Sequence, residues 1–88
     1  MEMDPQEMRP VVNRLKRARG QLDLVIRQIE EGQECSTAVH SLATVSGALD
    51  RAGFAIIFTT MKRIQRDPDH EVSDEEYEEL QKLFLSLS

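Results

Sequence analysis

The chain has few of the residues that build cross-linked or aromatic-rich cores: its 88 residues include one cysteine, one tyrosine, three phenylalanines and no tryptophan. A single cysteine excludes an intramolecular disulfide framework. A chain of this length buries only about two-thirds of its unfolded surface, which argues against a two-domain enzyme. We therefore expect one small domain that occupies residues 1–88.

Signals for export and for membrane insertion are also lacking. The first residues, Met1-Glu2-Met3-Asp4, have neither the basic nor the apolar region of a signal peptide. No uninterrupted apolar run approaches the roughly 20 residues that a membrane span needs. We therefore expect a cytoplasmic protein with no membrane partner.

Positive charge is scarce overall, since the net charge is −5, but the charges are divided along the chain. Residues 1–66 hold ten Lys and Arg against eight Asp and Glu, a balance of +2, whereas residues 67–88 hold one against eight, a balance of −7. Five of the cations lie between Arg9 and Arg19, in a stretch without any acidic residue. That stretch can present a local positive field to an anionic partner, whatever the net charge.

Apolar residues recur at three- and four-residue steps in three segments, which is the spacing of one face of an α-helix. The predicted helices occupy, in order, about residues 8–31, 36–66 and 74–87. Gly32 separates the first two, and the Asp-Pro-Asp sequence at 67–69 ends the second. No segment alternates with a period of two, so the expected fold class is all-α.

The helix ends carry further signals. Ser73 and Glu76 have the form of a capping box at the start of the third helix. The start of the first helix has two alternatives because a proline inside a helix is costly. Either a cap at Asp4 is followed by a first turn kinked at Pro10, or the helix begins near Pro10.

Two long helices joined by a tight turn form a hairpin, and a lone hairpin leaves one side of its apolar stripe in water. The apolar run over residues 54–58 wraps around the second helix, which is then expected to be covered on more than one side. Gly47 and Gly53, costly inside an exposed helix, indicate close helix packing. We therefore expect a three-helix protomer that forms an antiparallel four-helix-bundle dimer, with a larger symmetric assembly as its extension.

The basic stretch of the first helix is a candidate for binding phosphate groups. At 100° per residue, Arg14, Arg17 and Gln21 share one side of the helix, whereas Lys16 and Arg19 lie on another. Repeated in an oligomer, these cations form a wide basic surface suited to nucleic acid. The alternative is an ordinary solvated face, because short basic stretches are common and no aromatic residue is interleaved for base stacking.

Cys35 is the candidate reactive group. It stands at the beginning of the second helix, where free backbone N–H groups and the helix dipole favour a thiolate or a metal-bound thiol. The alternative is a cysteine that serves as a small buried apolar residue. His40, five residues on, lies about 140° around the helix and does not share a ligand site with Cys35 within that helix.

The other candidates for chemistry are weaker. His70 lies in an acidic link that we interpret as a solvated turn rather than a hard-metal loop. Met61 has the spacing of a core residue more than that of a Cu(I) ligand. No glycine-rich phosphate loop and no Ser/His/Asp arrangement is present, so we expect no enzymatic activity and no cofactor.

Three segments in order resemble the CsoR/RcnR/FrmR family of bacterial ligand-responsive repressors: residues 14–21, Cys35 after a Glu-Glu-Gly turn, and residues 48–53. The resemblance covers nearly the whole chain. It implies an all-helical protomer, antiparallel four-helix-bundle dimers, and a flat homotetramer that binds duplex operator DNA without a helix-turn-helix. It also implies that an inducer, such as Cu(I), Ni(II), formaldehyde or a sulfur species, releases the DNA.

The resemblance assigns roles to individual positions. The basic positions that match those associated with DNA contact are Arg14, Lys16, Arg17, Arg19 and Arg51. Cys35 matches the sensing cysteine. In metal-sensing members a His and a second Cys on the second helix meet that cysteine from the partner subunit, and here Thr60 and Ile64 stand in their places. A hydroxyl is a poor ligand for a soft metal and isoleucine is none, so no metal is expected at the usual site.

Other positions also depart from the family pattern. Glu2 stands where formaldehyde-responsive members have an N-terminal proline, and the single cysteine cannot form the pair of the persulfide-sensing branch. Ser41 and Ser46 replace a Gln and an Arg found in many members. These departures put part of the family's polar network and DNA contact in question.

The leading hypothesis is a homo-oligomeric, DNA-binding transcriptional repressor in which a thiol response of Cys35 replaces the metal signal. One alternative is a helical interaction module that binds no DNA and docks a basic partner on its acidic third helix. Another is a repressor with a rearranged Cu(I) site built from Cys35 with Met61 or His40.

Overall fold

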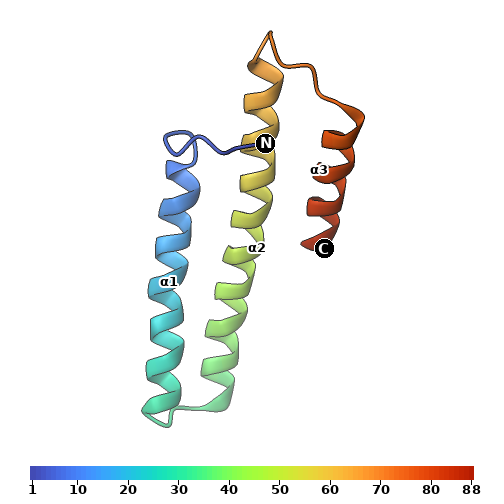
Figure 1. The fold of residues 1–88 in the computed structure, drawn as a ribbon. Helices are drawn as coiled ribbons and strands as arrows, with labels where there is room; N and C mark the ends of the chain where they lie inside the picture. Colours follow the sequence, from blue (N-terminus) through green and yellow to red (C-terminus); the bar gives the residue numbers. More distant parts are fainter.

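The computed structural model describes residues 1–88 as three helices and no strand (Figure 1). The helices are α1, Arg9–Glu30; α2, Cys35–Arg66; and α3, Asp74–Ser86. α1 and α2 run antiparallel as a long hairpin, and α3 turns back beside the C-terminal half of α2, on the side away from α1 (Figure 1). The protomer measures 56 × 25 × 13 Å, so it is a thin layer of helices. The all-α, three-helix protomer is confirmed.

The first of the two long helices begins near its proline. Met8 is the residue before α1, and Pro10 lies in the first turn, where its missing N–H has no intrahelical partner to lose. Asp4 instead closes a separate turn: its Oδ1 accepts a hydrogen bond from the Gln6 backbone N–H at 2.9 Å. The start near Pro10 is therefore the alternative that the chain adopts.

The turn between α1 and α2 is a glycine-dependent helix end. Gly32 has a φ of 69°, in the left-handed region that L side chains rarely adopt. The Gln33 N–H donates to the Gln28 carbonyl at 3.0 Å, and the Gly32 N–H donates to the Ile29 carbonyl at 3.1 Å. This pair of bonds is the Schellman pattern that satisfies the last carbonyl groups of a helix.

Most of the core lies in a seam between α1 and α2. Its buried apolar residues recur every seven positions, at Val11, Ala18 and Val25 on α1 and at Val45 and Ala52 on α2. Only 11 of 88 residues are buried, so the hairpin leaves much apolar surface uncovered. The exposed large apolar side chains of the hairpin are Val12, Leu22, Leu24, Ile26, Ile29, Val39, Leu42, Leu49 and Phe58.

α3 covers a second side of α2 through aromatic contacts. The ring of Phe84 lies 5.2 Å from that of Phe54 and 6.4 Å from that of Phe58, centroid to centroid. A Cβ added at Gly53 would lie 2.9 Å from Leu87 Cδ1. Leu87, which follows α3, can therefore pack against α2 because residue 53 has no side chain. The apolar run at 54–58 is therefore covered from two sides, as its pattern predicts. Close packing is found at Gly53.

Gly47 differs from the prediction. The contact that a Cβ there would make is with Nη1 of Arg51 at 3.4 Å, and no neighbouring helix approaches it. The Arg51 side chain therefore lies back along α2 over the space that this glycine leaves.

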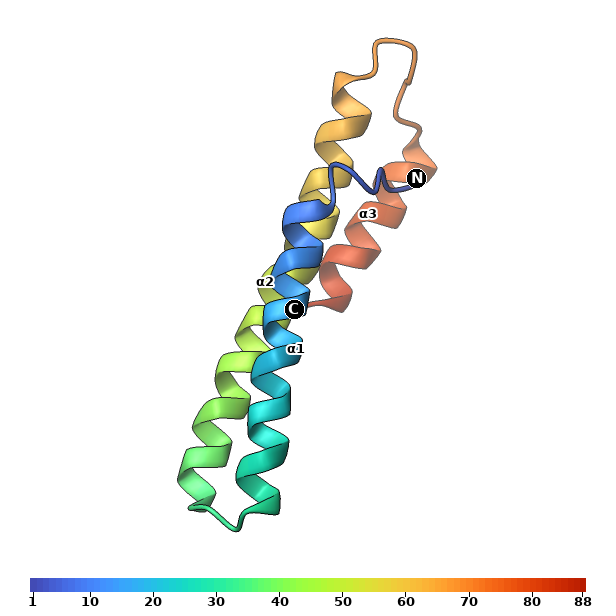
Figure 2. The same cartoon turned by 90° about the vertical axis from the view of Figure 1, so that its left-hand side faces the viewer.

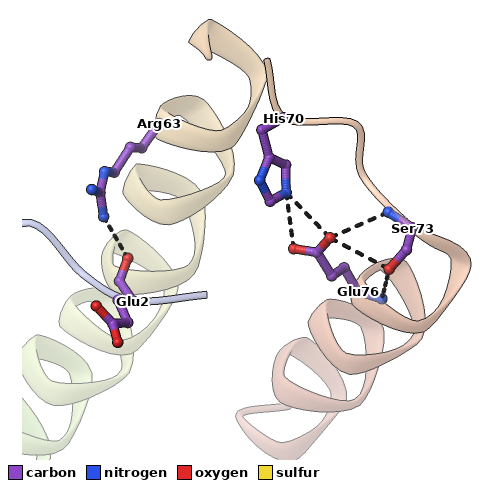
Figure 3. A network of polar contacts seen from close by, with 5 residues as sticks. All are labelled: Glu2, Arg63, His70, Ser73 and Glu76. Atoms are coloured by element: carbon purple, nitrogen blue, oxygen red, sulfur yellow. Dashed lines mark hydrogen bonds and ion pairs between the residues drawn. The ribbon is translucent and has the colours of Figure 1, made fainter. Parts of the chain in front are cut away.

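The start of α3 has the predicted capping box. Ser73 Oγ accepts from the Glu76 N–H at 3.2 Å, and the Glu76 carboxylate accepts from the Ser73 N–H at 3.3 Å. His70 joins this cap, with its Nε2 at 3.0 Å and 3.2 Å from the two Glu76 carboxylate oxygens (Figure 3). His70 thus belongs to the polar turn that caps α3.

The N-terminal segment lies against the end of α2. Arg63 donates to the Glu2 carbonyl at 2.7 Å (Figure 3), and Arg66 forms an ion pair with Glu7 at 2.6 Å. From the side, these first residues cross α2 towards the start of α3 (Figure 2). Two arginines of α2 are therefore occupied within the protomer.

α2 is more apolar over its length than its short apolar runs suggest. An 18-residue window of this 32-residue helix has a mean hydropathy of 1.3. α2 therefore has the length and the mean hydropathy of a membrane-spanning helix, although charged residues interrupt its apolar runs. Core helices of soluble proteins meet the same test, but only 17% of this window is buried inside the protomer. Most of its apolar surface is left for a further partner to cover.

Candidate nucleic-acid interface

Three arginines from two helices line one open cleft, which we call the arginine cleft. α1 contributes Arg14, Arg17 and Gln21, whose spacing of three and seven residues places them on one side of that helix. α2 contributes Arg51, and two alanines, Ala18 and Ala48, form the rest of the wall. The cleft has a volume of about 380 Å³. The small alanine side chains are what leave this space between the helices.

The guanidinium groups of the cleft form no ion pair within the protomer. The chain has one ion pair, Arg66 with Glu7, and a contact between His70 and Glu76 that is an ion pair when His70 is protonated, and neither involves a cleft arginine. No side-chain hydrogen bond is made by Arg14, Arg17 or Arg51 either, although the chain has 16 acidic residues. Three positive charges therefore share one cleft without an acidic neighbour in contact.

The five basic positions singled out by the sequence divide into two sets. Arg14, Arg17 and Arg51 meet in the cleft. Lys16 and Arg19 do not line it. At 100° per residue, Lys16 lies about 160° from Arg14, and Arg19 lies about 160° from Arg17. The grouping of Arg14 and Arg17 with Gln21, apart from the other two cations, is the one predicted from helical spacing.

Cys35 is the first residue of α2 and is exposed in the protomer. The interpretation of Cys35 as a buried apolar residue is therefore wrong for the protomer. Its surroundings are an apolar groove of about 350 Å³ at the turn end of the hairpin. The residues that line the groove are Val25, Ile29, Gln33, Cys35, Ala38, Val39 and Leu42.

Thr60 and Ile64 occupy the positions that carry metal ligands in the family that the chain resembles, and neither side chain is a suitable donor for a soft metal. Thr60 is buried, and its hydroxyl donates to the Ile56 carbonyl at 2.9 Å. Ile64 is buried as well. Cys35 lies 25 residues before Thr60 on the same helix, about 37 Å away along its axis. A second copy could bring its own Cys35 thiol to this place, where neither Thr60 nor Ile64 offers a soft donor.

A rearranged metal site is not assembled within the protomer either. Met61 lies between α2 and α3, next to Tyr77 and Leu80, about 39 Å along the helix from Cys35. His40 is exposed and on a different side of the helix from Cys35. No three His, Cys, Asp or Glu side chains gather into a group that could hold a metal ion. Within one protomer these donors therefore do not come together as the two or more soft ligands that a soft metal needs.

Gln28 is a buried polar residue that the helical pattern of the sequence does not predict. Gln28 is 7% exposed, and its Oε1 accepts no hydrogen bond. Its burial could have been predicted from its position, because Gln28 follows the buried Val25 by three residues and so lies on the same face of α1. A polar side chain at a seam position marks a place where the packing is incomplete in the protomer.

Comparison with known families bears on this geometry. The family described as "Metal-sensitive transcriptional repressor" matches residues 7–86, a range that contains all three helices, the arginine cleft and Cys35. The search of solved structures found no match. The resemblance to the CsoR/RcnR/FrmR repressors is confirmed by the family match. The chain belongs to the family of metal-sensitive transcriptional repressors.

Proposed function

We propose that this protein is a cytoplasmic transcriptional repressor that binds duplex operator DNA through the arginine cleft. The observation that carries the proposal is that three unpaired arginines, from α1 and α2, line one cleft in a member of a repressor family. Arginine donates paired, planar N–H groups that match the oxygens of a phosphate. Phosphate contacts of this kind position a protein on DNA without a recognition helix.

The acidic third helix does not compete for the cleft within the protomer. α3 packs on the C-terminal half of α2 through Phe84, and its only ion-paired carboxylate, Glu76, binds His70. Arg51 and the α1 arginines have no acidic contact from it. The local field of the cleft therefore stays positive although the whole chain has a charge of −5.

The apolar surface supports an oligomer whose clefts face outwards. Leu42 and Leu49 of α2 are exposed, and they lie about 180° and 160° around the helix from Arg51. Ile26 of α1 is also exposed, about 120° around from Arg14. A second copy that covers these side chains leaves both clefts open. An antiparallel four-helix-bundle dimer, paired again into a flat tetramer, then presents several clefts to one DNA duplex.

DNA binding by the cleft is tested with salt titrations. Fluorescence anisotropy of the promoter duplex is measured with the wild type, Arg14→Ala and Arg51→Ala. Removing one arginine that binds a phosphate should weaken binding and lower the slope of log affinity against log salt by about 0.9. Arg27→Ala is the matched control, because Arg27 is an exposed arginine of α1 that does not line the cleft.

Two results would contradict this function. If the protein does not bind the promoter duplex at low salt, the repressor function is wrong and the alternative of a helical interaction module that binds no DNA is favoured. An equal fall in affinity for Arg27→Ala would mean that the total charge, and not the cleft, attracts DNA. Lys16→Ala and Arg19→Ala, tested in parallel, determine whether the opposite side of α1 also binds DNA, as the family resemblance implies.

The signal that we propose is a reaction of Cys35 rather than metal binding. Its thiol is exposed, whereas the usual metal positions carry Thr60 and Ile64. After losing its proton to solvent, the thiolate attacks an electrophilic carbon and displaces the leaving group on that carbon, which is iodide in the case of iodoacetamide. We expect alkylation with iodoacetamide to weaken DNA binding by the wild type and to leave Cys35→Ser unaffected. Unchanged DNA affinity after complete alkylation would refute the thiol signal.

A further inference from the structure

We propose that the arginine cleft also binds free polyphosphate chains, and that such a ligand competes with DNA for the repressor. The ligand class is a linear chain of three or more phosphate groups, either inorganic or carried by a nucleotide. This inference concerns regulation of the proposed DNA site and rests on that proposed function for its competitive effect. The binding itself needs only the cleft.

The dimensions of the cleft suit a small ligand. Its volume of about 380 Å³ falls within the range of about 300–1,000 Å³ found for small-molecule sites. All of its wall comes from α1 and α2 of one protomer, so the site is complete before any copy associates. A single orthophosphate would leave much of this space empty, whereas a triphosphate chain would fill more of it.

The charge of the cleft suits a ligand with several negative charges close together. Arg14, Arg17 and Arg51 are unpaired, and each guanidinium has five N–H donors. A DNA strand presents its charges along a line, one for about every 3.4 Å of helix axis. A polyphosphate chain joins neighbouring phosphates through one oxygen, so its charges lie close enough together to meet the three arginines that line one cleft. Such charge-assisted, forked hydrogen bonds are among the strongest available to a protein.

The remaining residues that line the cleft offer little for recognising a nucleoside attached to the phosphate chain. Gln21 contributes one side-chain amide, which can donate to a phosphate oxygen, and Ala18 and Ala48 contribute methyl groups. No aromatic side chain lines the cleft on which a nucleobase could stack. Recognition is therefore of the phosphate chain, and a nucleoside attached to it adds little.

Direct binding is measured by isothermal titration calorimetry of sodium tripolyphosphate into the full-length protein, without DNA and at constant ionic strength. We expect one site per protomer, similar affinity for a nucleoside triphosphate, and weaker binding of orthophosphate. Arg17→Gln and Arg51→Gln should each weaken tripolyphosphate binding by about tenfold, the effect of losing a charged hydrogen bond. Arg27→Gln removes the same charge about 15 Å along α1 from Arg17 and should change the affinity by less than about twofold.

The outcomes separate this inference from the proposed function. No binding of tripolyphosphate, or an equal fall in affinity for Arg27→Gln, overturns the polyphosphate site even if DNA still binds. Binding of tripolyphosphate by a protein that does not bind promoter DNA overturns the repressor function and leaves the site. Where both bind, tripolyphosphate should displace DNA at a lower ionic strength than sodium sulfate does. Displacement by the two salts at equal ionic strength would overturn the competition.

Discussion

At the scale of single residues, the best-defined polar group is the carboxylate of Glu76. The hydrogen bond from the Ser73 backbone N–H and, after it, the contact with His70 hold the pKa of Glu76 below its ordinary value of 4.5, although desolvation opposes them. A lowered pKa in the folded state means that the ionised group stabilises the fold. This stabilisation is present above the unfolded value and is lost as the pH falls through the folded value.

The pH dependence of Glu76→Gln tests this assignment. At neutral pH the variant should have a lower Tm than the wild type, because it lacks the ionised cap. The difference between their Tm values should shrink as the pH falls below 4.5, since the wild-type carboxylate then becomes protonated too. Thermal melts followed by circular dichroism over about pH 3–7 measure the Tm values of the wild type and of the variant. Glu79→Gln, an exposed acid of the same helix outside the cap, is the control, and a difference that stays constant with pH would contradict the assignment.

At the scale of the helix, two glycines of the first 32 residues should respond oppositely to the same substitution. Gly32 ends α1 with a φ of 69°, so Gly32→Ala should cost about 1 kcal/mol because a Cβ is strained there. Gly20 lies inside α1 with nothing within 4 Å of an added Cβ. Gly20→Ala should therefore stabilise the protein by about 0.5–1 kcal/mol through helix propensity. Urea denaturation measures both, and a stabilising Gly32→Ala would contradict the role of the turn.

Helical spacing predicted the helices and one side of the site, but long-range contacts decided the rest. The 100° rule placed Arg14 with Arg17 because both lie on one helix. Arg51 could be predicted only through the family resemblance, since its place in the cleft depends on the register between α1 and α2. The position of α3 depends likewise on the contact between Phe54 and Phe84, which are 30 residues apart in sequence. The local spacing of residues within one helix determines neither the register between two helices nor contacts between residues that are far apart in sequence.

At the scale of the whole molecule, the protomer has too little core for its length. Its 11 buried residues lie mainly along one seam, and α2 has apolar side chains on the side away from Arg51. The buried Oε1 of Gln28 also has no hydrogen-bond partner. In the proposed oligomer, a second copy would cover this surface and add to the stability of the fold. The Tm of the wild type should then rise with protein concentration, as mass action requires for an oligomer.

Leu49→Glu tests how this association supports DNA binding. Leu49 is 47% exposed in the protomer, and a carboxylate there would have to be buried unpaired between two copies. We expect sedimentation velocity to give the 10.1 kDa protomer for Leu49→Glu and a larger assembly for the wild type. Asn13→Glu, which adds the same charge at an exposed position of α1, should sediment as the wild type does.

The cleft arginines are unchanged in Leu49→Glu, so a folded protomer should keep its tripolyphosphate affinity. Its affinity for promoter DNA should fall by at least about 100-fold, because the clefts of separate copies no longer bind one duplex together. If the separated copies unfold, circular dichroism will show a loss of helix that more concentrated protein partly restores, which reports the same dependence on association. Wild-type sedimentation of Leu49→Glu, with a wild-type Tm that does not depend on concentration, would show that a single protomer is the functional unit.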